Sequence, residues 1–218
     1  MLETNRGGSK MIKNVIFDLG NVIVQNPTPS IVEKFFEKEN DGKNFYEYIF
    51  KSEFWKMMDL GQITNEEIAN AIESQKLVEV SDYNEVKNFM INWFREIIEN
   101  EDTIEVAKEL KRKGYKIYVL SNMSKATYEY LAEKYDFFNI IDGAVVSAYE
   151  GMKKPDLRIF NVLLERYSLA AEECLLIDDD DTNKTFEAAS SLGIKGRRVN
   201  PNDVEDVKKS LIENNVEL

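Results

Sequence analysis

The chain of 218 residues is long enough to form one domain that carries an insertion, or two small domains. Lys and Arg number 28 against 40 Asp and Glu, a formal charge of −12 that argues against nonspecific binding to nucleic acid or to an anionic membrane. Histidine is absent, so no imidazole can act as base, nucleophile or metal ligand.

The cysteine content and the hydropathy indicate the cellular compartment of the protein. The single cysteine, Cys174, opens an apolar run and cannot form an internal disulfide, which fits a small buried side chain in a reducing compartment. No apolar run reaches the ~18 residues of a membrane-spanning helix, and residues 1–10 lack the apolar segment of a signal peptide. We therefore predict a cytoplasmic protein without a membrane partner, with residues 1–10 as a flexible leader or an expression remnant.

The first part of the chain contains one short strand and then a long helical stretch. Residues 14–17 form an apolar run that predicts a buried strand, and Asp18 follows it directly. Pro27 and Pro29 mark a boundary. From about residue 30 to residue 98 every signal is helical and no strand is expected. Within this stretch Thr64-Asn65-Glu66-Glu67 matches a capping box, which marks the start of a helix. An apolar helix face, which we interpret as packing, is formed by Val86, Phe89, Met90, Trp93, Phe94, Ile97 and Ile98.

From residue 103 strands and helices alternate. The expected helices are 103–113, 125–135, 156–167, 182–192 and 203–213, and the expected strands are 116–120, 144–147, 174–177 and 194–199. Such alternation implies a parallel sheet with helices on both faces. We therefore predict an α/β fold whose Rossmann-like parallel core comprises residues 11–27 and 97–218, with an all-helical insertion at residues 28–96.

Polar side chains follow the predicted strands at the ends where the chain leaves the sheet. Asp18 follows the first strand, Ser121 the second, and Asp178 and Asp179 the strand at 174–177. Sites in open parallel sheets lie at the carboxyl ends of the strands, so these side chains should converge although they are far apart in sequence. The sequence thus predicts a carboxylate-rich site at one edge of the sheet.

Four short stretches, taken in order, resemble the motifs of the haloacid dehalogenase superfamily, chiefly of its phosphatases. They are Val15-Ile16-Phe17-Asp18-Leu19-Gly20-Asn21, Leu120-Ser121-Asn122, Lys153-Lys154-Pro155-Asp156 and Leu176-Ile177-Asp178-Asp179. The resemblance covers the chain from about residue 13 and extends to a branch of small sugar-phosphate phosphatases that includes enzymes acting on glucose 1-phosphate. It implies that residues 28–96 form a helical cap, and that the partner is a small phosphorylated metabolite.

The resemblance also implies roles for individual residues. Asp18 would be the nucleophile that forms an aspartyl-phosphate. Ser121 and the backbone N–H of Asn122 would bind a phosphoryl oxygen, although Ser121 has an alternative role as a cap of the helix at 125–135. Lys154 would neutralise the phosphoryl charge, with Lys153 as the competing choice. The residues assigned to substrate binding are Gly20, Asn21, Ser121, Asn122 and Lys154.

The acidic run from Asp178 to Asp181 is the candidate metal site. Two carboxylates directly after a buried strand suit Mg²⁺, which prefers oxygen ligands and binds through one or two carboxylates plus a substrate phosphate. By resemblance Asp179 is a direct ligand, Asp178 acts through a water, and Asp18 with the backbone carbonyl of Gly20 completes the set. The last two aspartates of the run are assigned to solvent and to the next helix, whose N-terminus favours negative charge.

The sequence departs from the phosphatase pattern at one position. Phosphatases of the superfamily usually carry a second aspartate shortly after the nucleophile as general acid and base, and here that position is Gly20. General acid–base catalysis typically contributes ~10²–10⁴-fold in rate. We therefore favour a phosphatase whose leaving group needs little protonation, such as the anomeric hydroxyl of a sugar 1-phosphate, with Asn21, a cap residue or a water assisting.

Two other functions stay open at the level of sequence. The same scaffold suits a non-catalytic protein that binds a phosphorylated ligand or regulates another protein. A haloacid dehalogenase is disfavoured, because those enzymes need no metal and lack the paired acids that Asp178 and Asp179 form here. The aromatic side chains of the insertion belong either to its core, which we favour, or to a substrate pocket; they are Tyr46, Tyr48, Phe50, Phe54 and Trp55.

Overall fold

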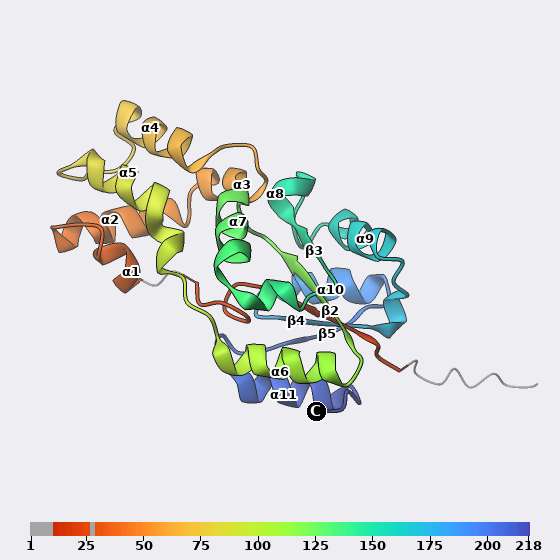
Figure 1. Cartoon of the computed structure of the whole chain (residues 1–218). Helices are drawn as coiled ribbons and strands as arrows, with labels where there is room; N and C mark the ends of the chain where they lie inside the picture. The colour runs from red at the N-terminus through yellow and green to blue at the C-terminus, as the bar shows by residue number, and fades with distance from the viewer. Residues whose placement is uncertain (1–10, 27–28) are drawn as a thin grey trace, which may run out of the picture.

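The structure of the chain is a computed structural model that describes residues 11–26 and 29–218 (Figure 1). The predicted leader at residues 1–10 lies outside the described residues, and so does the predicted boundary of the insertion at residues 27 and 28. Within the described ranges, no helix has both the length and the apolar composition that a membrane crossing requires.

A parallel sheet forms the centre of the described chain, in the order β3-β2-β1-β4-β5. Its strands are β1 (Asn14–Phe17), β2 (Lys116–Ser121), β3 (Gly143–Val146), β4 (Cys174–Asp178) and β5 (Lys195–Arg198). Each pairing is parallel, and Ile16 of β1 lies opposite Tyr118 of β2 and Leu176 of β4. Because β2 and β4 flank β1 on opposite sides, the carboxyl end of β1 is the crevice where such sheets bind ligands. The predicted α/β fold is confirmed.

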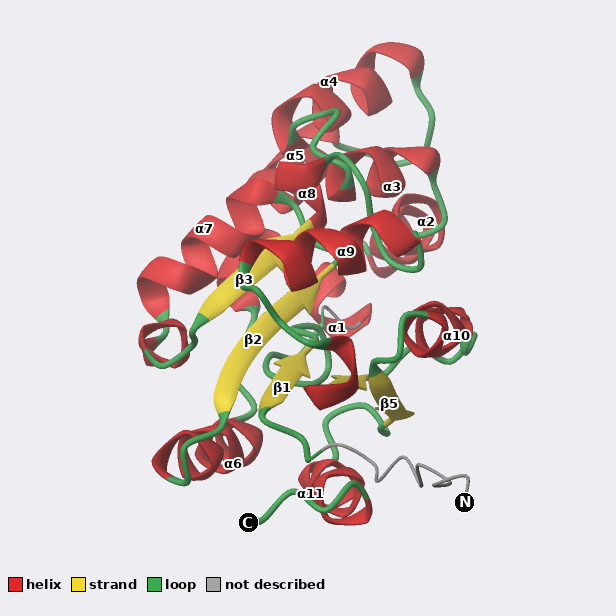
Figure 2. Cartoon of the chain, turned by 90° about the vertical axis from the view of Figure 1, so that its right-hand side faces the viewer, coloured by secondary structure: helices red, strands yellow, loops and turns green. Residues whose placement is uncertain are grey.

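Helices cover both faces of this sheet (Figure 2). α6 (Glu101–Arg112), α7 (Lys125–Lys134) and α11 (Val204–Glu213) contribute to the buried cluster that contains Phe17, whereas α9 (Leu157–Arg166) and α10 (Lys184–Ser191) pack with Ile16. Successive side chains of a strand point to opposite faces, which is why Phe17 and Ile16 belong to separate clusters. The elements predicted after residue 103 are confirmed, with ends that differ by one or two residues. Shorter connections contain η2 (Asp136–Asn139), α8 (Ser147–Glu150) and η3 (Ala171–Glu173).

Helices fill most of the described stretch between β1 and α6. They are α1 (Pro29–Glu33), α2 (Glu39–Ile49), α3 (Glu53–Asp59), α4 (Asn65–Gln75), α5 (Tyr83–Asn92) and the 3₁₀ helix η1 (Trp93–Glu96). The predicted capping box is present, because the Thr64 hydroxyl accepts the Glu67 N–H and the Glu67 carboxylate accepts the Thr64 N–H at 2.8 Å. Figure 1 shows α4 and α5 on the opposite side of the molecule from α6 and α11.

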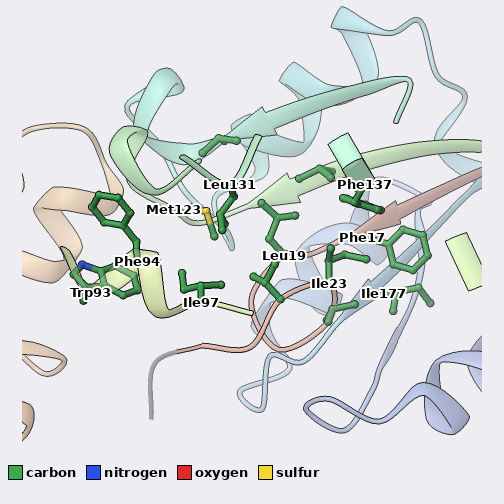
Figure 3. Close-up of a cluster of buried hydrophobic side chains, with 14 of the residues drawn as sticks. Phe17, Leu19, Ile23, Trp93, Phe94, Ile97, Met123, Leu131, Phe137 and Ile177 are labelled. Carbon is green, nitrogen blue, oxygen red and sulfur yellow. The ribbon is translucent and has the colours of Figure 1, made fainter. Parts of the chain in front are cut away.

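Buried apolar side chains join these helices to the sheet (Figure 3). The cluster extends from Phe17 in β1 through Leu19, Ile23 and Ile97 to Trp93 in η1, and each of these side chains is buried. Burial of apolar surface is the main force that holds packed elements together. The cluster therefore fixes the helical segment beside the carboxyl ends of the strands, where the predicted site lies.

One member of the predicted helix face is on the surface. α5 ends at Asn92 and η1 at Glu96, and Ile97 has extended backbone with φ −65° and ψ 133°, so the helical spacing stops before Ile98. The other six predicted side chains are buried, whereas Ile98 is 54% exposed. The assignment of Ile98 to the packed face was therefore wrong.

Candidate active site

Three aspartates meet at the carboxyl edge of the sheet. Asp18 follows β1, Asp178 ends β4 and Asp179 comes next, and one carboxylate oxygen from each lies within 4.8 Å of the others. The convergence arises because β1 and β4 are hydrogen-bonded neighbours in the sheet. A set of carboxylate oxygens is the kind of donor group that hard cations such as Mg²⁺ prefer.

The ammonium group of Lys154 lies between two of these carboxylates. Its Nζ is 2.9 Å from Asp18 Oδ1 and donates a hydrogen bond of 2.5 Å to Asp178 Oδ2, and the side chain is only 5% exposed. Lys153, the competing candidate, instead pairs with Asp59 at 3.0 Å. The two adjacent lysines therefore have different partners, and the one at the carboxylates is Lys154.

The side chain of Asn122 fixes the backbone of Lys154. Its Oδ1 accepts the Lys154 N–H at 2.8 Å, and its Nδ2 donates to the Lys154 carbonyl at 3.0 Å. These two bonds connect the segment after β2 to the segment that carries the lysine. The sequence predicts substrate binding through the Asn122 backbone, and nothing in it indicates this positioning contact of the side chain.

Burial dominates the electrostatics of Asp18. It raises the pKa of this carboxyl group to about 6, with Lys154 opposing the rise, Asp178 adding to it, and the Ser121 side chain opposing it. Burial alone would lower the pKa of Lys154, but Asp178 and Asp18 raise it, so the ammonium stays charged. Burial also raises the pKa of Asp179. Three carboxyl groups around one ammonium group would carry excess negative charge when ionised, which a divalent cation would balance.

One oxygen of the cluster lacks a hydrogen-bond donor. Asp18 Oδ1 is buried, and within residues 11–26 and 29–218 it accepts no aligned hydrogen bond, although Lys154 Nζ lies 2.9 Å away. Buried polar atoms are rarely left unpaired in native proteins. Coordination to a cation would satisfy this oxygen, so the residues present fit a hard divalent metal ion.

Asn21 supports the Asp179 carboxylate. Its Nδ2 donates to Asp179 Oδ2 at 2.9 Å, and its Oδ1 accepts the Asn26 N–H at 3.1 Å. Asn21 has a φ of 55°, a left-handed conformation in which asparagine is enriched. The side chain that the sequence analysis assigned to substrate binding is therefore engaged within the protein, where it orients a candidate metal ligand.

The third aspartate of the acidic run holds the loop before α10. Asp180 accepts hydrogen bonds from the Thr182 N–H at 2.9 Å, the Thr182 hydroxyl at 2.7 Å and the Thr185 N–H at 3.0 Å. Burial acts to raise the pKa of Asp180, but these hydrogen bonds lower it to about 2. The predicted assignment of Asp180 to the next helix agrees with these contacts, and Asp181 is exposed.

An amide group occupies the space beside Gly20. A Cβ atom at Gly20 would lie 2.6 Å from Asn26 Oδ1 and 2.8 Å from Asn26 Nδ2, which is closer than real contacts of this kind. Asn26 therefore fills the volume in which a side chain at position 20 would begin. Asn26 was not among the predicted site residues, because no local sequence pattern indicates that its side chain folds back over the turn after β1.

Two cavities adjoin at Asn122, which lines both. The first, of ≈ 410 Å³, contains Asp18, Lys154, Asp178 and Asp179 in its wall, and we call it the catalytic cavity. The second, of ≈ 350 Å³, we call the aromatic cavity; its apolar lining residues are Tyr46, Phe50, Trp55, Met58, Trp93 and Met123. Of the five aromatic residues that the sequence divided between core and pocket, three therefore line a pocket.

Comparison with known proteins places these residues in a family context. A family model described as haloacid dehalogenase-like hydrolase matches residues 12–185, a range that contains every candidate site residue. The chain is 27% identical over 185 residues to the sesquiterpene phosphatase astK of Aspergillus oryzae, covering 84% of this chain and 88% of that protein. It is 26% identical over 185 residues to the drimenol cyclase drtB of Aspergillus calidoustus, but spans only 33% of that protein's length.

Solved structures share the fold. A HAD family enzyme of Bacteroides thetaiotaomicron, bt-2542, matches with a TM-score of 0.70 at 21% identity, over 89% of this chain and 96% of that enzyme. The same enzyme has been solved in complex with magnesium and inorganic phosphate. At this level of identity the likeness establishes a common fold.

Proposed function

Because this chain belongs to the family of haloacid dehalogenase-like hydrolases, we propose that it is a Mg²⁺-dependent phosphomonoester hydrolase. The observation that carries the proposal is the buried group in which Lys154 lies between Asp18 and Asp178. The relative named as a sesquiterpene phosphatase and the related fold solved with magnesium and inorganic phosphate support this chemistry.

Hydrolysis proceeds in two displacement steps, with Asp18 as the nucleophile of the first and as the leaving group of the second. In the first, a carboxylate oxygen of Asp18 bonds to phosphorus while the bond between phosphorus and the ester oxygen breaks, and the leaving group takes a proton from water. In the second, water attacks the aspartyl-phosphate, which releases inorganic phosphate and restores the carboxylate. Lys154 stabilises the charge on the phosphoryl oxygens, and Ser121 with the Asn122 N–H binds one of them.

Asp18, Asp178, Asp179 and the backbone carbonyl of Gly20 would hold the Mg²⁺ ion, which when bound supplies Lewis-acid stabilisation of the phosphoryl charge. Two sets of contacts within the protein orient residues that would bind this ion and the phosphoryl group. Asn21 holds the Asp179 carboxylate at 2.9 Å, and the Asn122 amide holds the Lys154 backbone. Such supporting contacts fix the orientation of ligands before substrate arrives.

Phosphate release that depends on Mg²⁺ tests the proposal. We expect the wild-type protein to hydrolyse a phosphomonoester in Mg²⁺ and to lose this activity in a chelator. Mg²⁺ at ~100 times its Kd should stabilise the wild type by ~2.7 kcal/mol, seen as a higher Tm, and should stabilise Asp179→Ala much less. Asp181→Ala, which removes an exposed carboxylate of the same run, is the matched control.

The outcome also separates the alternative functions. An equal Mg²⁺ effect on the Tm of Asp179→Ala and of wild type would contradict the ligand assignment. Stabilisation by Mg²⁺ without phosphate release from any ester would favour a non-catalytic, ligand-binding protein. A haloacid dehalogenase would act in chelator, and the adjacent carboxylates of Asp178 and Asp179 argue against it.

The missing acid restricts the leaving group. Gly20 has no side chain that could protonate the ester oxygen, so fast hydrolysis requires a leaving group that departs with little help. The anomeric hydroxyl of a sugar 1-phosphate, predicted from the sequence, meets this requirement, and phenols meet it as well. In either case the substrate is a small phosphorylated metabolite.

Restoring an acid at position 20 should broaden the substrate range. In Gly20→Asp the new side chain collides with the Asn26 amide, so we expect the double variant Gly20→Asp/Asn26→Gly to accommodate it better. Hydrolysis of an alkyl phosphate, whose leaving group needs protonation, should then rise toward the ~10²–10⁴-fold that general acid–base catalysis contributes. The control is Asn26→Gly alone, measured on the same ester. An alkyl phosphate rate no higher in the double variant than in the control would show that Gly20 does not limit the reaction.

The division of the chain into a core at residues 11–27 and 97–218 and a helical cap at residues 28–96 belongs to the same proposal. It is supported by the helices between β1 and β2, of which α3 carries Trp55 and Asp59 to the aromatic cavity. A cap over the catalytic cavity would exclude water from the phosphoryl group. A cytoplasmic location stays a prediction, supported by the buried free thiol of Cys174.

A further inference from the structure

The aromatic cavity shares Asn122 with the catalytic cavity, and the proposed reaction leaves its chemistry unused. We propose that it binds the leaving group of the substrate, and that it selects an uncharged, apolar and planar group, so that the preferred substrate is an aryl phosphate monoester. The inference rests on the proposed phosphatase activity and names its substrate class.

The position of the cavity suits a leaving group. Asn122 lines both cavities, and its amide holds Lys154, whose ammonium group contacts Asp18. Asn21 lines the aromatic cavity and hydrogen-bonds Asp179 in the wall of the catalytic cavity. A phosphoryl group at Asp18 would therefore have its ester oxygen at the junction, with the rest of the ester directed into the aromatic cavity.

A continuous series of aromatic rings forms one side of the cavity. The ring centroids are 4.9 Å apart for Tyr46 and Phe50, 4.4 Å for Phe50 and Trp55, and 5.2 Å for Trp55 and Trp93. Tyr46, Phe50 and Trp55 are only partly buried, so their faces have contact area to offer a ligand. Aromatic side chains pair with other aromatic groups at centroid separations of this order.

The polar lining residues are largely engaged with the protein itself. The hydroxyl groups of Ser124 and Thr127 hydrogen-bond each other at 2.8 Å. The amide of Asn122 is bonded to Lys154 through both its oxygen and its nitrogen, and the amide of Asn21 is bonded through both of its atoms as well. These four residues leave few polar atoms to pair with the several hydroxyl groups of a sugar, and burying unpaired polar groups is unfavourable.

The charge of the cavity disfavours a second anionic group on the substrate. None of the residues that line it in the described chain is basic, and Asp59 adds a carboxylate whose side chain is 11% exposed. The ammonium group of Lys153 is paired with this carboxylate at 3.0 Å. A carboxylate or a second phosphate on the leaving group would therefore enter without a cation to balance it.

One donor in the wall of the cavity lacks a partner. Trp93 lines the cavity and is 4% exposed, and its Nε1–H has no hydrogen-bond partner among the described residues. Figure 3 shows this side chain together with Met123, which follows β2 and lines the same cavity. That nitrogen is itself buried, so the indole offers the cavity its apolar surface and no accessible donor for the hydroxyl groups of a polyol. Phenols also leave readily without an acid at Gly20, so the cavity and the missing side chain favour the same class.

Steady-state kinetics on a matched panel test the inference. The panel contains 1-naphthyl phosphate, a phenyl phosphate that carries a carboxylate, glucose 1-phosphate, and acetyl phosphate, which is too small to fill the cavity. We expect kcat/KM for naphthyl phosphate to exceed that for the carboxylated ester and for glucose 1-phosphate by ~10-fold or more, as for other hydrophobic pockets. Equal or faster turnover of glucose 1-phosphate or of the carboxylated ester would overturn the inference.

Variants of the lining residues test whether the preference for an aryl phosphate arises in the aromatic cavity. Trp55→Ala should lower the ratio of kcat/KM for naphthyl phosphate over acetyl phosphate by ~10-fold, mainly through KM. Tyr46→Ala, at another partly buried ring of the cavity, is a second variant with the same expected direction should Trp55→Ala unfold. Tyr48→Ala removes an aromatic ring of α2 that does not line the cavity, and should leave the ratio unchanged. An unchanged ratio in both cavity variants would contradict the inference.

The same assays distinguish failure of the proposed phosphatase activity from failure of the substrate class alone. Absence of phosphate release from every member of the panel, or release above the uncatalysed background that persists in Asp18→Asn, would overturn the phosphatase mechanism and the substrate class with it. Release from acetyl phosphate that requires Asp18, without preference among the larger esters, would overturn the substrate class alone.

Discussion

Replacement of Asp18 by asparagine should reduce phosphate release by ~10⁴–10⁶-fold, as loss of a catalytic nucleophile does in other hydrolases. The amide has nearly the shape of the carboxylate but does not attack phosphorus, so the aspartyl-phosphate does not form. The measurement is phosphate release at saturating Mg²⁺, with Asp181→Asn as the control because it changes an exposed aspartate beyond the cluster. Wild-type turnover by Asp18→Asn would exclude the nucleophilic mechanism.

The stability of the same variant should separate chemistry from folding. Burial raises the pKa of Asp18 to about 6, so between pH ~4 and ~6 the folded protein binds more protons at this group than the unfolded chain does. The contribution of Asp18 to stability therefore falls as pH rises through this window, and above it the ionised group opposes folding. Without metal at pH 7, Asp18→Asn should match or exceed the wild type, by up to ~3 kcal/mol. A large loss of Tm would mean that inactivity reflects unfolding.

The centre of the sheet was predictable because three of its strands are buried on both faces. Such strands appear in sequence as short continuous apolar runs, and β1, β2 and β4 follow this pattern. The helix expected from residue 182 begins instead at Lys184. The difference has a local cause, since Asn183 has a φ of 60° and Asp180 accepts hydrogen bonds from Thr182 and Thr185. Side-chain bonds of this kind compete with the first turn of a helix.

The site residues that could be predicted from the sequence are those that lie at the carboxyl ends of the strands. Residues at the carboxyl ends of adjacent parallel strands must be near each other, which is why Asp18 and Asp178 could be grouped from sequence. The roles of Asn26 and of the Asn122 side chain were not predictable, because they depend on where a loop folds back. Sequence position alone left Lys153 and Lys154 as competitors, and their ion pairs distinguish them.

Removal of the Lys154 charge should impair both folding and catalysis. In Lys154→Met the carboxylates of Asp18 and Asp178 stay buried without their shared cation, and breaking a buried ion pair from one side typically destabilises a protein by ~3–5 kcal/mol. Loss of the ammonium group from the phosphoryl site should also lower kcat by at least ~10²–10³-fold, the effect of removing one preorganised donor. Denaturant unfolding and phosphate release measure the two effects.

The pH dependence of the variant should show why it is unstable. Without the ammonium group the pKa of Asp18 rises further, because the largest opposing contribution is gone. Protonation then removes the unpaired charge, so the stability deficit of Lys154→Met relative to the wild type should shrink as the pH is lowered from 7 to 5. Lys153→Met, which breaks only the pair with Asp59, is the matched control and should lose much less activity. If the two methionine variants lose equal activity, the assignment of the phosphoryl contact to Lys154 is wrong. If the deficit of Lys154→Met is the same at both pH values, it comes from lost packing of the lysine side chain and not from unpaired carboxylates.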